Sequence, residues 1–280
     1  MGDETRLLIG AAELARRLGS AAPPVVADCR FALADPGAGE KGWREAHIPG
    51  SHYLHLERDL SGPRAATGGR HPLPEPAAFS AVMRRIGLDS DRLLVVLDDS
   101  RAAFAARLWW LARYFGHGEV RVLDGGLRVW REQGLPLSAD PPLARAGNFT
   151  ARPDPRMRVD FEFVVAAAPG TVLVDAREAR RFAGLEEPID PLAGHIPGAC
   201  NRPWIEATRE DGSFLGADEQ AARWRDLPRA AEPVVYCGSG VTACVNLLSL
   251  ELAGIPGARL YPGSWSDWCS RPGVPVARGF

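Results

Sequence analysis

The stretch VVYCGSGVTAC (Val234–Cys244) joins an apolar, β-branched run to a helix-like pattern through a loop that contains two glycines. Short β-branched runs of this kind are typical of the buried strands of a parallel sheet. A helix that follows such a strand indicates an α/β unit, and ligands of these folds bind at the carboxyl ends of the strands. Because Cys237 stands at such an end, the stretch predicts both the fold class and the place of a functional site.

The loop after Cys237 has the residues that a bound anion needs. A thiol becomes a good nucleophile only when it ionises, and a helix N-terminus lowers its pKa because free amides and the helix dipole stabilise the thiolate. Gly238 and Gly240 can adopt positive φ angles and have no Cβ to block an approaching group, while Ser239 and Thr242 offer hydroxyl donors. The loop therefore favours a nucleophilic thiolate, or the persulfide anion formed from it, over a core cysteine that happens to precede a turn.

Cysteine phosphatases use the same strand–loop–helix geometry and are the first alternative. They need an arginine six residues after the cysteine, because a guanidinium binds the phosphate oxygens in a bidentate way. Ala243 stands at that place here, and CGSGVTA contains no basic residue. We therefore expect sulfur chemistry rather than phosphate chemistry at Cys237.

Composition and charge exclude several other classes of protein. The net charge of −2 over 280 residues gives no reason to expect a nucleic acid or an anionic membrane as a partner. No stretch reaches the roughly 20 apolar residues that span a bilayer, and the acidic start MGDETR does not resemble a secretory signal. Five cysteines without a CxxC pair or a zinc-like Cys/His cluster predict reduced thiols in a cytoplasmic protein that uses no metal and no cofactor.

The chain repeats itself, which predicts two homologous α/β domains. We expect them at residues 1–142 and 158–280, each with a mainly parallel sheet and helices on both faces. A Pro- and Ala-rich linker at residues 143–157 is expected to join them. Four matched pairs come in the same order in both copies: VVADCR (25–30) with VLVDAR (172–177), AHIPGSHYLHL (46–56) with GHIPGACNRPW (194–204), LVVLDD (94–99) with PVVYCG (233–238), and VLDGGLRVWREQGLPL (122–137) with LYPGSWSDWCSRPGVPV (260–276).

The repeat also supplies an internal comparison for the cysteine loop. Asp98 occupies the place of Cys237 in the first copy, and a carboxylate cannot carry sulfane sulfur. The residues that follow it, SRAAFAARLWW, lack the glycines that would open an amide cradle. We therefore predict a catalytically inactive first domain and one site per chain, and we expect Trp109 and Trp110 in the core on an amphipathic helix.

Taken together, these motifs resemble the tandem rhodanese-domain sulfurtransferases, and most closely the 3-mercaptopyruvate sulfurtransferases among them. The resemblance rests on CGSGVTA (237–243), the two HIPG segments, VDAR with the following RF, DGGLRVW and PGSW, and it covers nearly the whole chain. It implies two rhodanese folds, the second of them catalytic, and a persulfide intermediate on Cys237. It also implies a small-molecule sulfur donor and a thiol acceptor such as thioredoxin, or cyanide.

The resemblance implies roles for further residues. Arg181 matches an arginine that binds the anionic group of the substrate, and the cradle residues Gly238, Gly240, Val241 and Thr242 would contact the donor and the persulfide. His71 matches a histidine that forms a proton relay with the loop serine, Ser239, and an acidic residue. By position that acid is Glu57, with Asp59 as the alternative.

The donor is the point that the sequence leaves open. Ile189 stands where the mercaptopyruvate enzymes tend to carry a second arginine, which speaks against mercaptopyruvate, whereas a loop without basic residues speaks against the thiosulfate dianion. We predict transfer from 3-mercaptopyruvate, with thiosulfate as the alternative donor and a non-catalytic persulfide carrier as the alternative of another class. His47 and His195 of the HIPG segments occur in both copies, so we assign them a role in the fold rather than in a metal site.

Overall fold

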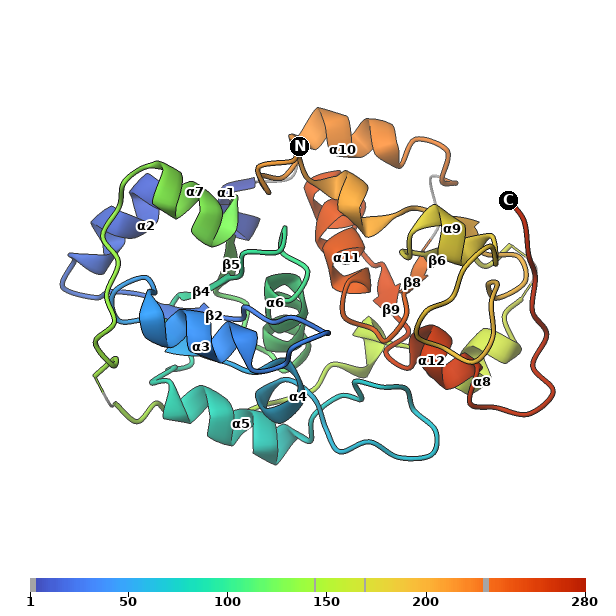
Figure 1. Ribbon diagram of the computed structural model, residues 1–280, viewed down its shortest axis with the longest axis horizontal. Coiled ribbons are helices and arrows are strands. Elements are labelled where there is room, and N and C mark those ends of the chain that lie inside the picture. The colour runs from blue at the N-terminus through green and yellow to red at the C-terminus, as the bar shows by residue number, and fades with distance from the viewer. Residues whose placement is uncertain (1–3, 144, 169, 229–231) are drawn as a thin grey trace.

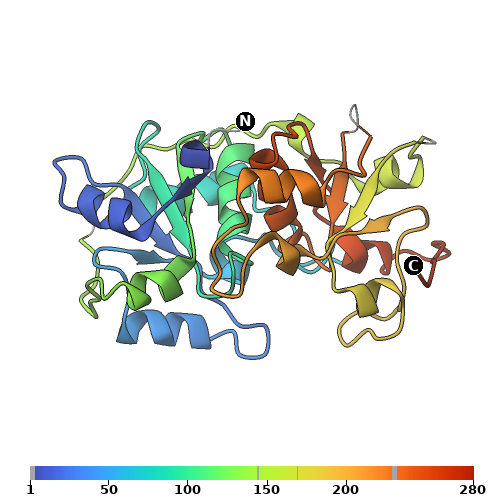
Figure 2. The ribbon, with the colours of Figure 1, turned by 90° about the horizontal axis from the view of Figure 1, so that it is seen from above.

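The computed structural model describes residues 4–143, 145–168, 170–228 and 232–280. The chain forms two α/β halves that lie side by side, the first blue to green and the second yellow to red (Figure 1, Figure 2). The start of the acidic N-terminal segment, residues 1–3, lies outside the described residues. Within the described part of the chain, no helix combines the length and the apolar character that crossing a membrane requires.

The first half is built on a parallel sheet with the strand order β1-β5-β4-β2-β3. Its strands β2 and β4 are buried at every residue, and their side chains alternate between two cores, so that Val25 faces one and Val26 the other. Helices therefore cover both faces of the sheet. The elements are α1 (Glu4–Leu7), β1 (Leu8–Ile9), α2 (Ala11–Leu18), β2 (Val25–Asp28), α3 (Ala38–Glu45), β3 (His52–Tyr53), α4 (Leu56–Asp59), α5 (Pro76–Arg85), β4 (Leu94–Leu97), α6 (Ala105–Tyr114), β5 (Val120–Leu123) and α7 (Gly126–Glu132).

The second half repeats this sheet with the parallel order β7-β6-β8-β9, in which β6 and β8 take the places of β2 and β4. The predicted α/β class, with parallel sheets and helices on both faces, is confirmed. The elements are η1 (Pro155–Met157), α8 (Phe161–Val165), β6 (Leu173–Asp175), α9 (Ala179–Phe182), β7 (Cys200–Asn201), η2 (Trp204–Ala207), α10 (Ala217–Arg223), β8 (Val234–Tyr236), α11 (Ala243–Leu252), β9 (Arg259–Leu260) and α12 (Ser264–Trp268).

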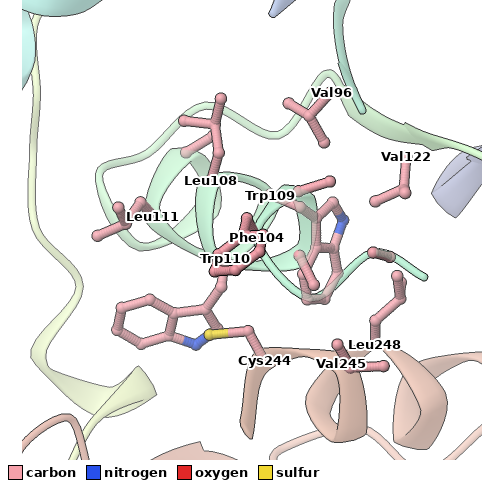
Figure 3. Close-up of a cluster of buried hydrophobic side chains, with 14 of the residues drawn as sticks. Val96, Phe104, Leu108, Trp109, Trp110, Leu111, Val122, Cys244, Val245 and Leu248 are labelled. Carbon is pink, nitrogen blue, oxygen red and sulfur yellow. The ribbon is translucent and has the colours of Figure 1, made fainter. Parts of the chain in front are cut away.

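The two halves share one hydrophobic core, and the helices that follow the sister loops meet in it. Trp109 and Trp110 of α6 are each 1% exposed and lie with Cys244, Val245 and Leu248 of α11 (Figure 3). The prediction that both tryptophans belong to the core is confirmed. The expected amphipathic pattern is wrong, because the second half covers the face of α6 that an isolated domain would expose to water.

The HIPG histidines, His47 and His195, occupy equivalent positions in the two halves. Nδ1 of His47 donates to the Trp43 carbonyl at 2.7 Å, and Nδ1 of His195 donates to the Phe182 carbonyl at 2.8 Å. The backbone of each histidine also pairs with the strand-like end of its own half, at Ser138 and Ala277 respectively. This supports the assignment of both histidines to the fold.

The predicted linker runs along the surface of the first half. The amides of Gly147, Phe149 and Arg152 donate to backbone carbonyls of α5, of the turn after it and of the residue after α6, at 2.9 to 3.1 Å. Phe149 is 3% exposed and belongs to the shared core. The segment is therefore packed, and the boundaries at residues 143 and 157 stay a prediction.

Candidate active site

Cys237 follows β8 directly and lies on the wall of a cavity of about 320 Å³ that both halves line. The residue is buried at 2% exposure although it lines this cavity. Of the predicted loop residues, Gly238, Ser239, Val241 and Thr242 line the cavity, whereas Gly240 lies behind it.

The loop at residues 238–242 leaves its backbone amides free. These amides donate to no acceptor in the part of the chain that the structure describes. Gly240 has φ +75°, and a Cβ there would lie 2.4 Å from the carbonyl oxygen of Pro262, so only glycine fits. The amides of Trp265 and Ser266 donate to the carbonyls of Cys237 and Gly238 at 3.0 and 2.9 Å and hold the loop in place. Free amides at the start of α11 can bind an anion beside Cys237.

The structure brings His71 of the first half to Ser239 of the cysteine loop. Their Nδ1 and Oγ atoms are 2.8 Å apart, which is a hydrogen bond across the domain interface. Glu57 lies on the other side of the ring, with 3.9 Å between its Oε1 and Nε2 of His71, which exceeds a hydrogen-bond distance. Its side chain is 50% exposed. Asp59 is engaged elsewhere, since its carboxylate pairs with Arg85 at 2.6 Å.

His71 is neutral near pH 7. Burial lowers its pKa to about 3, and the positive charges of Arg107, Arg70 and Arg64 act in the same direction. In the neutral ring one nitrogen donates and the other accepts. A neutral imidazole that is bonded to a serine hydroxyl can pass a proton to or from a group beside that hydroxyl.

Arg181 lies in α9 and lines the same cavity. Its Nη2 forms an ion pair with Glu187 at 2.7 Å, and the side chain is 12% exposed. Ile189, by contrast, adds no charge to the cavity wall and is 47% exposed at its rim. The sequence-predicted anion-binding residue is thus at the cavity, and the position of the missing second arginine is apolar.

Sequence reasoning missed Arg70, which enters the cavity from the first half. It pairs with Asp190 of the second half, and its backbone amide donates to Ser266 Oγ at 3.1 Å. Its position directly before His71 was the only signal in the sequence.

Arg107 was missed as well. It is fully buried in α6 and donates to the carbonyls of Gly240 and His71 at 3.0 and 3.1 Å. It forms no ion pair with any carboxylate of the described residues, and its charge interacts with the sulfurs of Cys237 and Cys244. One buried cation therefore ties the cysteine loop to the predicted relay, and a lone arginine in the apolar run AARLWWLA was the available signal.

The sister loop of the first half corrects one prediction. An amide cradle does form there, because Arg101 and Ala102 adopt φ +58° and +64° although neither is glycine. The Asp98 carboxylate fills this cradle, and it accepts four backbone hydrogen bonds of 2.8 to 3.0 Å from the amides of Ser100, Ala102, Phe104 and Ala105. The prediction of an inactive first half keeps its basis in Asp98, but the predicted absence of a cradle is wrong.

Comparison with known proteins places this geometry in a family. The rhodanese-like domain profile matches residues 10–133 and again residues 165–271. A protein of Pseudomonas aeruginosa named "probable 3-mercaptopyruvate sulfurtransferase" is 47% identical over 97% of this chain and 98% of its own length. A Mycobacterium tuberculosis protein provisionally named thiosulfate sulfurtransferase is 40% identical over 98% of both chains.

A solved structure agrees with these sequence matches. The 3-mercaptopyruvate sulfurtransferase of Escherichia coli superimposes with a TM-score of 0.81 at 34% identity, covering 92% of this chain and 98% of the other. The relatives carry the names of both donors, so the comparisons give the reaction class, sulfur transfer, and leave the choice of donor to the site itself.

Proposed function

Since the chain belongs to the tandem rhodanese-domain sulfurtransferases, we propose that it transfers sulfane sulfur from 3-mercaptopyruvate, through a persulfide on Cys237, to a thiol acceptor. The observation that carries the choice of donor is the 2.8 Å hydrogen bond between His71 and Ser239 beside Cys237. Mercaptopyruvate needs such a proton-handling pair, because its leaving group is a carbon that must be protonated. Thiosulfate needs none, because sulfite leaves as an anion.

In the first step, the Cys237 thiolate attacks the thiol sulfur of mercaptopyruvate. The S–S bond forms while the C–S bond breaks, and the enolate of pyruvate leaves. The proton of the donor thiol moves to the enolate carbon by way of Ser239 and His71, so that the products are pyruvate and the Cys237 persulfide anion. Because His71 is neutral, its Nδ1 can accept the hydrogen bond of the Ser239 hydroxyl and orient that hydroxyl for the transfer.

The persulfide anion is then held until an acceptor arrives. The free amides of residues 238–242 are suited to its negative charge, and the buried guanidinium of Arg107 adds a positive charge behind the loop. A thiolate of the acceptor attacks the outer sulfur, the Cys237 thiolate leaves, and the acceptor departs as a persulfide. Cyanide would leave as thiocyanate by the same displacement.

Thiosulfate remains the second candidate donor, and a specific observation favours it. Two guanidiniums, those of Arg70 and Arg181, lie at the cavity although the cysteine loop itself has no basic residue. A dianion can use positive charge from elsewhere in the fold. The sequence argument against thiosulfate is weaker for this reason.

Steady-state turnover with each donor, using cyanide and a dithiol as acceptors, tests the proposal. We expect the higher kcat/KM with 3-mercaptopyruvate and a Cys237 peptide that gains the mass of one sulfur atom in mass spectrometry. Ser239→Ala should lower kcat with mercaptopyruvate by about a hundredfold and leave the thiosulfate rate unchanged, because only the first donor needs the proton. Equal losses with both donors would contradict the proton-handling role.

A non-catalytic persulfide carrier would behave differently in the same assay. It would accept sulfur from a partner protein and show no turnover with either small donor. Absence of turnover by the wild type therefore contradicts the proposal of an enzyme. Turnover by the wild type that is lost in Cys237→Ser supports it. The acceptor in the cell, with thioredoxin as the expected class, and the cytoplasmic location stay predictions.

A further inference from the structure

Two guanidiniums, one from each half, converge on the backbone next to Cys237. A Cβ built on Gly238 would lie 3.0 Å from Nη2 of Arg70 and 3.6 to 3.7 Å from the two Nη atoms of Arg181. Arg70 belongs to the segment between α4 and α5 in the first half, and Arg181 belongs to α9 in the second. Gly238 has no side chain that would keep a ligand away from either group.

Two of the three carboxylates that pair with these arginines, those of Asp190 and Glu187, stand behind them. Asp190 pairs with Arg70 through Oδ1 and lies 3.4 Å from Arg181 Nη2 through Oδ2. The side chains of Asp190 and Glu187 are each 3% exposed and do not line the cavity, whereas those of Arg70 and Arg181 are 20% and 12% exposed and do. The third carboxylate, Glu178, lines the cavity 3.8 Å from Arg181 Nη1, and its side chain is 54% exposed and solvated. The cavity therefore meets two guanidiniums and one solvated carboxylate.

Each guanidinium also has donors to spare. Nη2 of Arg70 makes no hydrogen bond to any of the described residues. Nη1 of Arg181 makes no hydrogen bond to the described residues, and the Glu178 carboxylate lies 3.8 Å from it, beyond hydrogen-bond distance. A planar guanidinium with free N–H groups matches the paired oxygens of a carboxylate or a sulfonate.

We propose that Arg70 is a donor-binding residue, which forms with Arg181 an interdomain clamp for the anionic group of the sulfur donor. This assignment rests on the proposed function and gives its substrate class, a sulfur compound whose reactive sulfur lies next to a carboxylate or a sulfonate-like group. In this clamp Arg70 supplies the second positive charge, which Ile189 does not provide.

A purely structural role for Arg70 is the alternative, since its ion pair with Asp190 and its hydrogen bond to Ser266 also join the two halves. The two roles differ in what they do to charged and neutral reagents. A clamp accelerates the reaction of Cys237 with an anion only. A structural contact affects anionic and neutral reagents alike.

Alkylation of Cys237 in the full chain separates them, because the thiolate displaces iodide from both anionic iodoacetate and neutral iodoacetamide. We expect the iodoacetate-to-iodoacetamide rate ratio, followed on the Cys237 peptide by mass spectrometry, to fall about tenfold in Arg70→Gln and in Arg181→Gln. Arg180→Gln is the matched control. It removes the same charge one residue from Arg181, from a side chain that is 66% exposed and outside the cavity, and should leave the ratio unchanged.

Arg70→Met is a second neutral variant that keeps the length of the buried stem, in case the glutamine variant does not fold. A ratio in the folded Arg70 variant within about twofold of the wild type, or an equal fall in Arg180→Gln, overturns the clamp. The result is independent of the proposed function. If the wild type turns over no donor but the ratio still falls in the Arg70 variant, the clamp is supported and the mercaptopyruvate reaction is contradicted. If the wild type turns over mercaptopyruvate but the ratio is unchanged in the variant, the reaction is supported and the clamp is contradicted.

Discussion

The loop after β4 and the loop after β8 occupy the same place in the two halves and are used in two ways. In the first half the amides around the loop close on the carboxylate of Asp98, which is 1% exposed. In the second half the amides of residues 238–242 have no acceptor among the described residues, and the side chain in the place of Asp98 is the thiol of Cys237. The first loop binds the carboxylate of its own Asp98, whereas the second can bind an anion that forms on Cys237 during the proposed reaction. The comparison teaches that this fold builds an anion cradle at this strand end whether or not glycines are present.

The first half contributes to the cavity in spite of its closed loop. Ser100 and Phe104, which follow Asp98, line the cavity together with the cysteine loop. His71, Arg70 and Arg107 reach the cysteine loop from the same half. Both copies therefore line one cavity, and the proposed nucleophile and the groups around it come from different halves.

Cys237→Asp tests the comparison most severely, because it makes the two loops chemically alike. A carboxylate cannot accept sulfane sulfur, so we expect turnover to fall by at least about a thousandfold with either donor. The cradle should accept the new carboxylate as it accepts Asp98, so thermal unfolding should stay close to that of the wild type. Cys200→Ser, which changes a thiol outside the cavity, is the control and should retain activity. Unfolding of Cys237→Asp would show that the two cradles are not equivalent.

Asp98→Asn tests how much the bound carboxylate stabilises the loop of the first half. The variant keeps the shape of the side chain but turns one of the two acceptors into a donor that faces the amides of Phe104 and Ala105. Charge-assisted hydrogen bonds are lost and buried amides are left unpaired, so we expect the free energy of unfolding to fall by about 3 kcal/mol. Urea denaturation monitored by circular dichroism gives the value. Asp99→Asn, the exposed neighbour, should change it by less than about 0.5 kcal/mol.

The burial of His71 between the two halves predicts that the stability of the fold depends on pH. Since burial lowers the pKa of His71 to about 3, the unfolded chain binds a proton near pH 6.5 that the folded chain does not. The folded state therefore loses stability as the pH falls below 6.5, by about 2 kcal/mol between pH 7 and pH 5 from this residue. Urea unfolding at both pH values should show this loss in the wild type and a smaller one in His71→Gln. Equal losses in the two proteins would mean that His71 is already protonated in the folded state.

Much of the site could be predicted because its signals are local. The strand VVY, the glycines at 238 and 240 and the start of α11 are neighbours in the chain, so their spacing alone indicates a cysteine at an anion-binding loop. The repeat indicated the two halves and the substitution by Asp98. The predicted pair His71 and Ser239 is indeed brought together, whereas Glu57 stops short of a hydrogen bond.

Other features had no local signal. The cradle around Asp98 depends on positive φ at Arg101 and Ala102, and the Arg101 side chain donates to Thr208 Oγ1 of the other half at 2.9 Å. Glycine content is therefore an incomplete guide to where a chain can turn its amides inward.

By itself the sequence predicted two parallel α/β repeats, a nucleophile at Cys237 and an inactive first half with Asp98 in its place, because periodicity and spacing are properties of neighbouring residues. Only the tertiary structure decided that Arg70 and Arg107 belong to the site. Their guanidiniums reach the cysteine loop across the domain interface, from positions more than a hundred residues away in the chain. The contacts of Arg107 arise from the packing of α6 against α11, and those of Arg70 from the pairing of its segment with Asp190 and Ser266. No short-range sequence pattern predicts either set.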